Sequence, residues 1–180
     1  MILHPGAAFV RVLIPEDEIS KRVELVAGQI ARAYEGQPLT IVGVLTGCLV
    51  FLADLIRRLD LPLRIALVQA SSYRGATTQG GELHIQDDLL PDLKGRHILL
   101  IDDILDTGRT MKHLVDHLRG LGTASVRTAV LLRKKGRQEV AIEPDFVGFE
   151  IPNEFVVGYG LDYDDEFRNL PFIGVLDRPA

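Results

Sequence analysis

Two adjacent carboxylates, Asp102 and Asp103, end a run of apolar residues, and a polar turn follows them after two further apolar positions. The turn spans Asp106–Thr110, reads Asp-Thr-Gly-Arg-Thr, and ends where a helix is predicted to begin. Glycine lets the backbone approach an anion closely, and threonine hydroxyls donate hydrogen bonds. The free N–H groups and positive dipole at a helix start point to the same place. The turn therefore has the residue types of a phosphate-binding loop.

The acid pair suits a different part of a ligand, because Asp102 and Asp103 would repel a phosphate. Their oxygens can accept hydrogen bonds from sugar hydroxyls, or approach a divalent cation of the Mg²⁺ type. A phosphate together with a vicinal diol describes a ribose 5-phosphate group. The alternative is structural: the acids end a strand, and the Asp-Thr-Gly triplet makes a turn and a helix cap. The full order of strand, acids, turn and helix is more specific than that alternative requires.

These residues need a strand that carries the acids to the edge of a sheet and a helix that starts behind the turn. His97–Asp102 is the strongest predicted strand, and Thr110–Leu121 is predicted as an amphipathic helix. In an open α/β sheet, ligands bind beyond the carboxyl ends of the strands, where this turn would lie. Apolar and amphipathic segments alternate along the chain, which predicts an α/β fold with a mainly parallel sheet. The other predicted core elements are helices over Glu16–Tyr34 and Cys48–Leu59 and strands over Leu39–Leu45, Leu63–Ala70 and Ala124–Leu132.

The segment Ser71–Pro91 differs from the rest, because it carries three glycines, several charges and only a weak strand signal near Glu82–Ile85. Roughly twenty residues with so little predicted structure are uncommon in a compact domain, and such segments are often lids or binding loops. The alternative is an exposed β-hairpin or a disordered insertion.

The composition indicates a globular chain and does not favour a nucleic-acid or membrane partner. Apolar residues make up 47% of the 180 residues and charged residues 25%, which excludes a disordered or fibrous chain. Lys and Arg number 20 against 25 Asp and Glu, and a net charge of −5 does not favour a nucleic-acid partner. No apolar run is long enough to span a bilayer, and Met1–Arg11 lacks the features of a secretory signal. We therefore expect a cytoplasmic protein with no membrane partner.

Two other features have a structural interpretation. Cys48 is the only cysteine, which excludes an internal disulfide and a cysteine-based zinc site, and we expect it to be a small buried residue. His113 and His117 have the spacing of a zinc-binding pair on a helix, but the glutamate that accompanies such a pair in the HExxH pattern is missing. We expect these histidines to be solvated or partly packed.

The motif Asp102–Thr110 resembles the phosphoribosyl pyrophosphate-binding motif of phosphoribosyltransferases. The remainder is similar to one branch of them, the hypoxanthine-guanine phosphoribosyltransferases, and the resemblance covers nearly the whole chain after about residue 10. The segments that carry it are Val44–Gly47, the pair Ser72-Tyr73, Leu131–Lys134, Pro144–Pro152, Phe155–Tyr163 and Phe167–Pro171.

The resemblance implies a type I phosphoribosyltransferase fold, in which a central parallel β-sheet is flanked by helices and carries a small C-terminal hood. Residues 1–180 would form one domain, with a core over about 12–140 and a mobile lid over about 71–91. The hood would run from about 141 to 180 and include the N-terminal segment. The family analogy also implies a homodimer or a homotetramer.

The resemblance further implies a reaction: ribose 5-phosphate is transferred from phosphoribosyl pyrophosphate to N9 of hypoxanthine or guanine, and pyrophosphate leaves. Asp106 would be the general base near N7 of the purine. Asp102 and Asp103 would hold the ribose hydroxyls, directly or through Mg²⁺. The 5′-phosphate would be held by Thr107, Gly108, Arg109 and Thr110, next to Asp106.

The same resemblance assigns the other parts of the site. Lys134 would donate to the 6-oxo group, Phe155 would stack on the ring, and the Val156 backbone would read the purine edge. Asp162 would lie with the purine-binding residues and bind Mg²⁺ on the pyrophosphate side. Pyrophosphate would be bound by Leu45, Thr46, Gly47 and Arg168, and the lid residues Ser72 and Tyr73 would cover the site.

Two positions depart from the family pattern. The pyrophosphate loop often has Lys or Arg where this chain has Thr46, so a side-chain cation is missing unless backbone N–H groups make the contact. The first acid of the motif is often Glu, and Asp102 is one methylene shorter. The shorter side chain alters the reach to the ribose hydroxyls without changing the chemistry.

Two rival functions are open at this stage. The first is a phosphoribosyltransferase for xanthine or a pyrimidine, and Lys134 and the Phe155 segment argue against the pyrimidine. The second is a regulatory protein that keeps the fold and senses nucleotides while binding DNA. The presence of Asp106 and the net charge of −5 argue against the regulatory protein.

Overall fold

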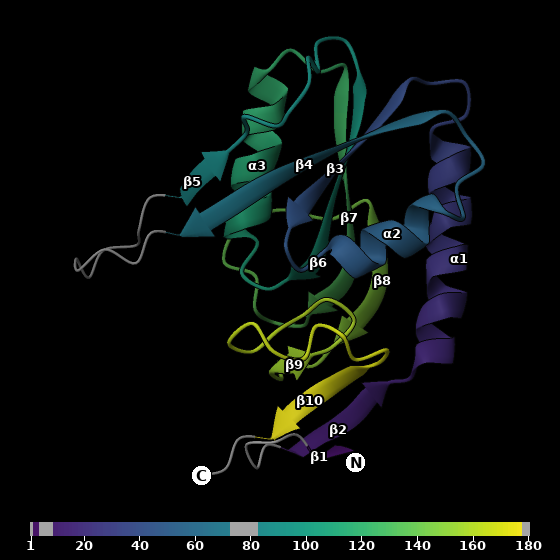
Figure 1. Ribbon diagram of the computed structural model, residues 1–180. Helices are drawn as coiled ribbons and strands as arrows, with labels where there is room; N and C mark the ends of the chain where they lie inside the picture. The colour runs from purple at the N-terminus through teal and green to yellow at the C-terminus, as the bar shows by residue number, and fades with distance from the viewer. Residues whose placement is uncertain (1, 4–8, 73–82, 178–180) are drawn as a thin grey trace.

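The computed structural model describes residues 2–3, 9–72 and 83–177, and its largest element is a six-stranded sheet (Figure 1). Five of its strands are parallel, and the edge strand β5 pairs with β4 in the antiparallel direction. This confirms the predicted α/β class with a mainly parallel sheet. In sheet order the strands are β5 (Leu83–Gln86), β4 (Leu63–Ser72), β3 (Leu39–Leu45), β6 (His97–Leu105), β7 (Ser125–Lys134) and β8 (Phe146–Ile151).

Helices cover both faces of this sheet, with α1 (Glu16–Ala33) and α2 (Leu49–Ile56) on one side and α3 (Arg109–Gly120) on the other (Figure 1). Alternate residues of β6 explain this arrangement. Leu99 packs in the cluster that contains the apolar residues of α1 and α2, and Leu100 packs in the cluster that contains those of α3. A parallel strand buried on both faces reads as a continuous apolar run, which is why the sequence identified β6 so clearly.

A second, smaller sheet forms the hood and lies beyond the arrowheads of β6, β7 and β8 in Figure 1. It is antiparallel, and β10 pairs with both β2 and β9. The hood therefore joins the two ends of the described chain above the carboxyl edge of the large sheet. In sheet order its strands are β1 (Ile2–Leu3), β2 (Phe9–Ile14), β10 (Ile173–Asp177) and β9 (Val156–Val157).

Strand β8 lies within the segment from about residue 141 onward, but it belongs to the large sheet. β8 pairs in parallel with β7, from Ala129 opposite Phe146 to Lys134 opposite Ile151, and so extends the large sheet. The absence of a side chain at Gly148 allows this pairing, because a Cβ there would collide with the carbonyl oxygen of Leu131. No strand was predicted from the sequence where β2 lies. Its pairing with β10 joins residues more than 150 positions apart.

The segment expected to be a lid is described only at its two ends. β4 and β5 pair as an antiparallel ladder from Gln69 opposite Gln86 to Ser72 opposite Leu83, as in the β-hairpin alternative. Tyr73 lies outside the described residues. Among the helices that are described, none is both long and apolar enough to cross a membrane.

Candidate active site

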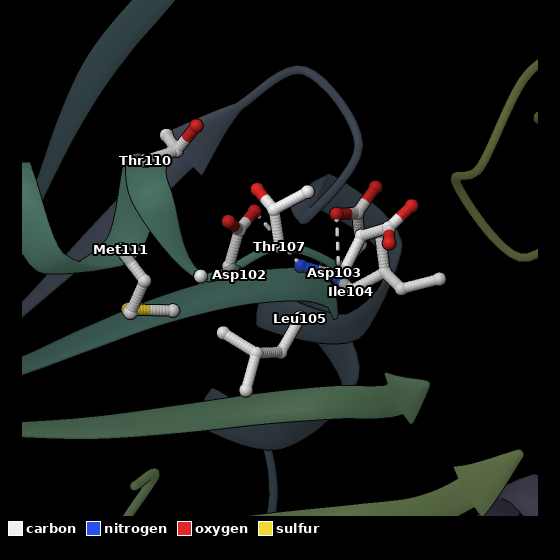
Figure 2. Close-up of a pocket in the computed structure, with 9 residues that line it drawn as sticks. Asp102, Asp103, Ile104, Leu105, Thr107, Thr110 and Met111 are labelled. Carbon is white, nitrogen blue, oxygen red and sulfur yellow. Dashed lines mark hydrogen bonds between the residues drawn. The ribbon is translucent and has the colours of Figure 1, made fainter. Parts of the chain in front are cut away.

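The acid pair stands near the end of β6, where the large sheet meets the hood. The carboxylate of Asp102 accepts a hydrogen bond from the backbone N–H of Asp103 at 3.0 Å, and that of Asp103 accepts one from Ile104 at 2.7 Å. Figure 2 shows both carboxylates pointing away from Leu105, on the same side as the Thr107 hydroxyl. The end of β6 and the turn after it thus direct two acids and a hydroxyl to one side of the chain.

Burial makes the charged forms of these two acids unfavourable. Burial raises the pKa of Asp102 well above its ordinary value, and the neighbouring Asp103 carboxylate raises it further. Burial also raises the pKa of Asp103, while the guanidinium of Arg168 acts in the opposite direction. A bound cation or hydrogen-bond donors from a ligand would stabilise the ionised pair.

The donor set fits Mg²⁺. Asp102 and Asp103 supply hard oxygen ligands, and Mg²⁺ commonly binds through one or two carboxylates together with substrate phosphates and water. Within residues 2–3, 9–72 and 83–177, no three His, Cys, Asp or Glu residues gather into a cage that could hold a metal alone.

The polar turn leads directly into α3 and frames a cavity of about 230 Å³. Gly108 is the residue before the helix, with a positive φ of 82°, a conformation that favours glycine. Gly108 has no side chain to cap α3, and the backbone N–H of Arg109 donates to the hydroxyl of Thr107 at 3.4 Å. Backbone N–H groups at a helix start can donate to a bound anion. The cavity is lined by Asp102–Gly108, Thr110 and Met111.

Asp106 is held by two cations. Its Oδ2 accepts a hydrogen bond from Nζ of Lys134 at 3.1 Å, and its Oδ1 accepts one from Nε of Arg137 at 2.8 Å. Burial alone would raise the pKa of Asp106, but the hydrogen bonds and charges of Arg137 and Lys134 outweigh it and hold the pKa below its ordinary value. Asp106 is therefore an ionised carboxylate at neutral pH and can accept a proton.

A second cavity, of about 210 Å³, opens beside the first. The apolar ring of Phe155 is 38% exposed and packs edge-on against Tyr163, with ring centroids 5.6 Å apart. Phe155 is therefore not a core residue, which was the alternative to a role in stacking on a ligand. An aromatic face, a lysine and an aspartate suit a planar polar ring. The cavity is lined by Asp103, Ile104, Asp106, Lys134, Phe155, Val156, Leu161 and Asp162.

Arg168 lies at the hood side of this opening and is held by the chain around it. Its guanidinium pairs with the carboxylates of Asp162 at 2.9 Å and Asp165 at 3.0 Å, and donates to the carbonyl oxygen of Gly160 at 2.9 Å. The second oxygen of Asp162 accepts from the N–H of Asp165 at 3.0 Å. Asp162 and Arg168 thus form one charged unit near Asp103.

The loop after β3 touches both the acid pair and the hood. A Cβ at Gly47 would collide with the Asp103 carboxylate, and one at Gly160 would collide with the carbonyl oxygen of Gly47. Leu45 and Thr46 are joined by a cis peptide bond, and the side chain of Thr46 is exposed. The predicted pyrophosphate-binding residues therefore adjoin the predicted ribose-binding residues.

Most of the residues singled out in the sequence meet at this one edge, although they come from separate segments of the chain. The turn and acid pair come from β6 and the start of α3, Lys134 from the end of β7, and Phe155, Asp162 and Arg168 from the hood. Nothing can be placed for Tyr73 or for the side chain of Ser72. Sequence reasoning missed Arg137, which stood only as part of a short basic run, Arg133–Arg137, with no signal to separate it from a solvated residue.

The two features interpreted structurally line neither of the two cavities. Cys48 is fully buried, and burial raises the pKa of its thiol to about 12, as expected of a small core residue. Nε2 of His117 lies 2.8 Å from Oδ2 of Asp87, while His113 is exposed. The histidine pair therefore packs as expected, with one member in contact with a neighbouring loop.

Comparison with known proteins supplies independent evidence. The sequence matches the family of the phosphoribosyl transferase domain over residues 15–164. Hypoxanthine-guanine phosphoribosyltransferase of Streptococcus pneumoniae is 43% identical over 166 residues, which cover 92% of each chain. The enzyme of the same name from Bacillus subtilis is 44% identical over 170 residues, or 94% of each chain.

Solved structures agree with the sequence relatives. A hypoxanthine phosphoribosyltransferase from Staphylococcus aureus superposes with a TM-score of 0.88 at 41% identity, covering 93% of this chain and 91% of that one. A variant of the Trypanosoma cruzi enzyme, in a ternary complex with substrates, superposes with a TM-score of 0.87 at 38% identity, covering 93% and 95% of the two chains. The shared architecture extends over both the large sheet and the hood.

Proposed function

The chain belongs to the phosphoribosyltransferase family, in its hypoxanthine-guanine branch, and from this premise we propose how its site works. The reaction transfers ribose 5-phosphate from phosphoribosyl pyrophosphate to N9 of hypoxanthine or guanine. The products are the nucleoside monophosphate and pyrophosphate, as in purine salvage. The partners are therefore these small molecules.

One observation carries the assignment of the site: the phosphate turn and the ring-binding cavity share a wall. Asp103, Ile104 and Asp106 line both cavities. A ligand with a phosphate at one end and a planar base at the other would reach from the start of α3 to Phe155 past these three residues. A nucleoside 5′-monophosphate has this shape.

The residues around the ring-binding cavity select a 6-oxopurine. Lys134 donates to the 6-oxo group, Phe155 stacks on the ring, and the Val156 backbone and Asp162 lie at the purine edge. An adenine amino group would meet the Lys134 ammonium donor to donor and leave a buried charge poorly paired. Asp106 accepts the N7 proton as the ring becomes bonded to ribose.

Charge develops at the opposite side of the ribose. The transition state resembles an oxocarbenium ion, and negative charge grows on the departing pyrophosphate. Arg168 and the backbone N–H groups near Thr46 and Gly47 stabilise this charge. Ser72 and Tyr73 belong to the segment that we propose covers the site, because water would capture the oxocarbenium ion.

We propose that Asp102 and Asp103 hold the ribose hydroxyls directly or through Mg²⁺, and that Asp162 binds a Mg²⁺ on the pyrophosphate side. When bound, the cation supplies Lewis-acid stabilisation of the phosphate oxygens. The raised pKa values of the acid pair support this assignment, because two buried carboxylates are stabilised in their ionised forms by a cation. Asp102 and Asp103 hold the ribose hydroxyls and thereby orient the ribose carbon that becomes bonded to the purine.

Pyrophosphate release measured with a panel of bases tests this function. With phosphoribosyl pyrophosphate and Mg²⁺ present, hypoxanthine and guanine should be turned over, and adenine and uracil should be poor substrates. Xanthine as the preferred base would replace the proposed substrate class with the first rival. Nucleotide-sensitive DNA binding without turnover would establish the regulatory rival instead.

We propose in addition that the chain forms a homodimer or a homotetramer. Exposed apolar side chains support association, with Leu25 on α1 60% exposed and Ile65 on β4 46% exposed. Sedimentation equilibrium at micromolar concentration should give a mass of two or four chains. A single-chain mass across that range would contradict the proposal.

A further inference from the structure

We propose that Arg137 is a positioning residue for Asp106. Arg137 holds one oxygen of the Asp106 carboxylate from outside the two cavities. The other oxygen is then left to contact the purine. The inference rests on the proposed function, because it concerns the residue that accepts the N7 proton there. The contacts around Asp106 support this inference.

The two oxygens of Asp106 have different partners. Oδ2 faces Lys134, whose side chain is only 11% exposed and lines the ring-binding cavity. Oδ1 faces Arg137, whose side chain is 41% exposed and is absent from the lining of both cavities. Arg137 thus contacts the carboxylate without lining either cavity.

This division gives the two cations different tasks. Lys134 must donate to the purine 6-oxo group, and an N7 proton must reach Oδ2, the oxygen that Lys134 now occupies. Both events weaken the contact between Lys134 and Asp106 when a purine enters. The bond from Arg137 to Oδ1 is unaffected by either event, so Arg137 alone keeps the plane of the carboxylate fixed during proton transfer.

The β7–β8 connection, residues 135–145, places Arg137 for this task because it is fastened to the phosphate turn. The N–H of Glu139 donates to the carbonyl oxygen of Thr107 at 2.9 Å, and the Glu139 carboxylate pairs with Arg109 at 2.7 Å. Side chains of the connection also pack on Gly108, where a Cβ would lie 2.9 Å from Cγ2 of Ile142. Arg137 and Asp106 are therefore carried on two segments that are joined directly after the ion pair.

The chain offers a matched control two positions away. Lys135 is also a cation of the β7–β8 connection, but its side chain is 65% exposed and its Nζ lies 3.6 Å from Glu150 on β8. Lys135→Met removes the same charge as Arg137→Met without touching Asp106. A difference between these variants measures the contact with Asp106 rather than the loss of charge.

The experiment is a double-mutant cycle on kcat and KM for hypoxanthine and phosphoribosyl pyrophosphate. We expect Arg137→Met to lower kcat by roughly 10- to 100-fold, because small misplacements of a catalytic group are costly, and to change both KM values little. Asp106→Asn should lower kcat by roughly 10²–10⁴-fold, as removal of a general base does. In the Asp106→Asn background, Arg137→Met should change kcat by less than about twofold, since both act through one group. Lys135→Met should behave as the unaltered chain, and Arg137→Lys should restore part of the lost kcat.

Three results would overturn the inference. Equal effects of Arg137→Met with and without Asp106→Asn would show that Arg137 does not act through Asp106. An effect of Lys135→Met as large as that of Arg137→Met would show that the loss of positive charge, and not the loss of the contact with Asp106, lowers the rate. A rise in KM with kcat unchanged would make Arg137 a binding residue. Failure of the proposed function is a separate result: the unaltered chain would release no pyrophosphate with any base, or Asp106→Asn would retain its rate.

Discussion

Asp102 and Asp103 lie in a different electrostatic environment from Asp106, although all three stand within five residues. This difference indicates the chemistry of each. Burial raises the pKa of Asp102 and of Asp103, whereas Lys134 and Arg137 hold the pKa of Asp106 below its ordinary value. The first two are suited to a cation or to donors from sugar hydroxyls. Asp106 is already ionised and is suited to accept a proton.

The sequence predicted these three acids and not the residue that holds one of them. The acids stand in a local motif, so their order along the chain reveals them. Arg137 reaches Asp106 from 31 positions away, and only the folded β7–β8 connection brings the two together. A basic residue beside a glycine carries no sequence signal that distinguishes this contact from exposure to solvent.

Replacing Lys134 tests the residue that reads the purine. We expect Lys134→Ala to raise KM for hypoxanthine by roughly 10- to 100-fold, because a hydrogen bond to a charged group contributes about 1.5–3 kcal/mol. The KM for phosphoribosyl pyrophosphate should change by less than about threefold. Steady-state kinetics with each substrate varied in turn gives both values, and Lys135→Ala is the control for the loss of charge. Equal increases in both KM values would contradict the placement of Lys134 at the base.

At the scale of elements, the active site depends on one close approach between the large sheet and the hood. Gly47, in the loop after β3, lies against Gly160 in the hood and also adjoins the acid pair at Asp103. A hydrogen bond of 2.6 Å from the hydroxyl of Tyr159 to Asp54 ties the hood to α2 beside this contact. The pyrophosphate side of the site is thus fixed by backbone contact between two separate parts of the fold.

A side chain at this contact should disturb binding as well as stability. Gly160 has a φ of 101°, and a Cβ there would collide with the carbonyl oxygen of Gly47. We expect Gly160→Ala to lower the free energy of unfolding by about 1–3 kcal/mol and to raise KM for phosphoribosyl pyrophosphate. Denaturant unfolding and steady-state kinetics measure these effects.

Gly95→Ala is the matched control for the backbone strain. Gly95 has a φ of 69°, and a Cβ there would meet no atom within 4 Å. This variant should lose stability without a change in KM. If Gly160→Ala gave only the effects of Gly95→Ala, the contact between loop and hood would have no part in substrate binding.

Elements built from local patterns were predictable, and those built from distant pairing were not. The sequence prediction for β3 has the observed bounds, and the observed α1 ends one residue before the predicted end, because buried strands and amphipathic helices have clear periodicities. The hood strand β2 and the placement of β8 in the large sheet depend on partners far along the chain. Short strands of this kind are stabilised by their neighbours rather than by their own sequence.

At the scale of the whole molecule, one ligand should bridge the large sheet and the hood. Inosine monophosphate would contact the start of α3 through its phosphate and the hood residue Phe155 through its base. A ligand that binds only the folded state at about 100 times its Kd adds about 2.7 kcal/mol of stability. For a chain of this size, thermal unfolding should therefore shift upward by roughly 5–10 °C.

Uridine monophosphate at the same concentration is the control for this shift, because it carries the same phosphate and ribose with a different base. It should give a smaller increase in Tm than inosine monophosphate. Equal shifts for the two nucleotides would show that the base does not reach the cavity formed by Lys134 and Phe155.

A crystal structure with bound inosine monophosphate and Mg²⁺ tests the account most directly. We predict the 5′-phosphate on the N–H groups of Gly108–Thr110 at the start of α3, with the 6-oxo group facing Lys134 and N7 facing Asp106. A nucleotide whose phosphate lies elsewhere, with the Asp106–Thr110 turn making no contact to it, would contradict the account.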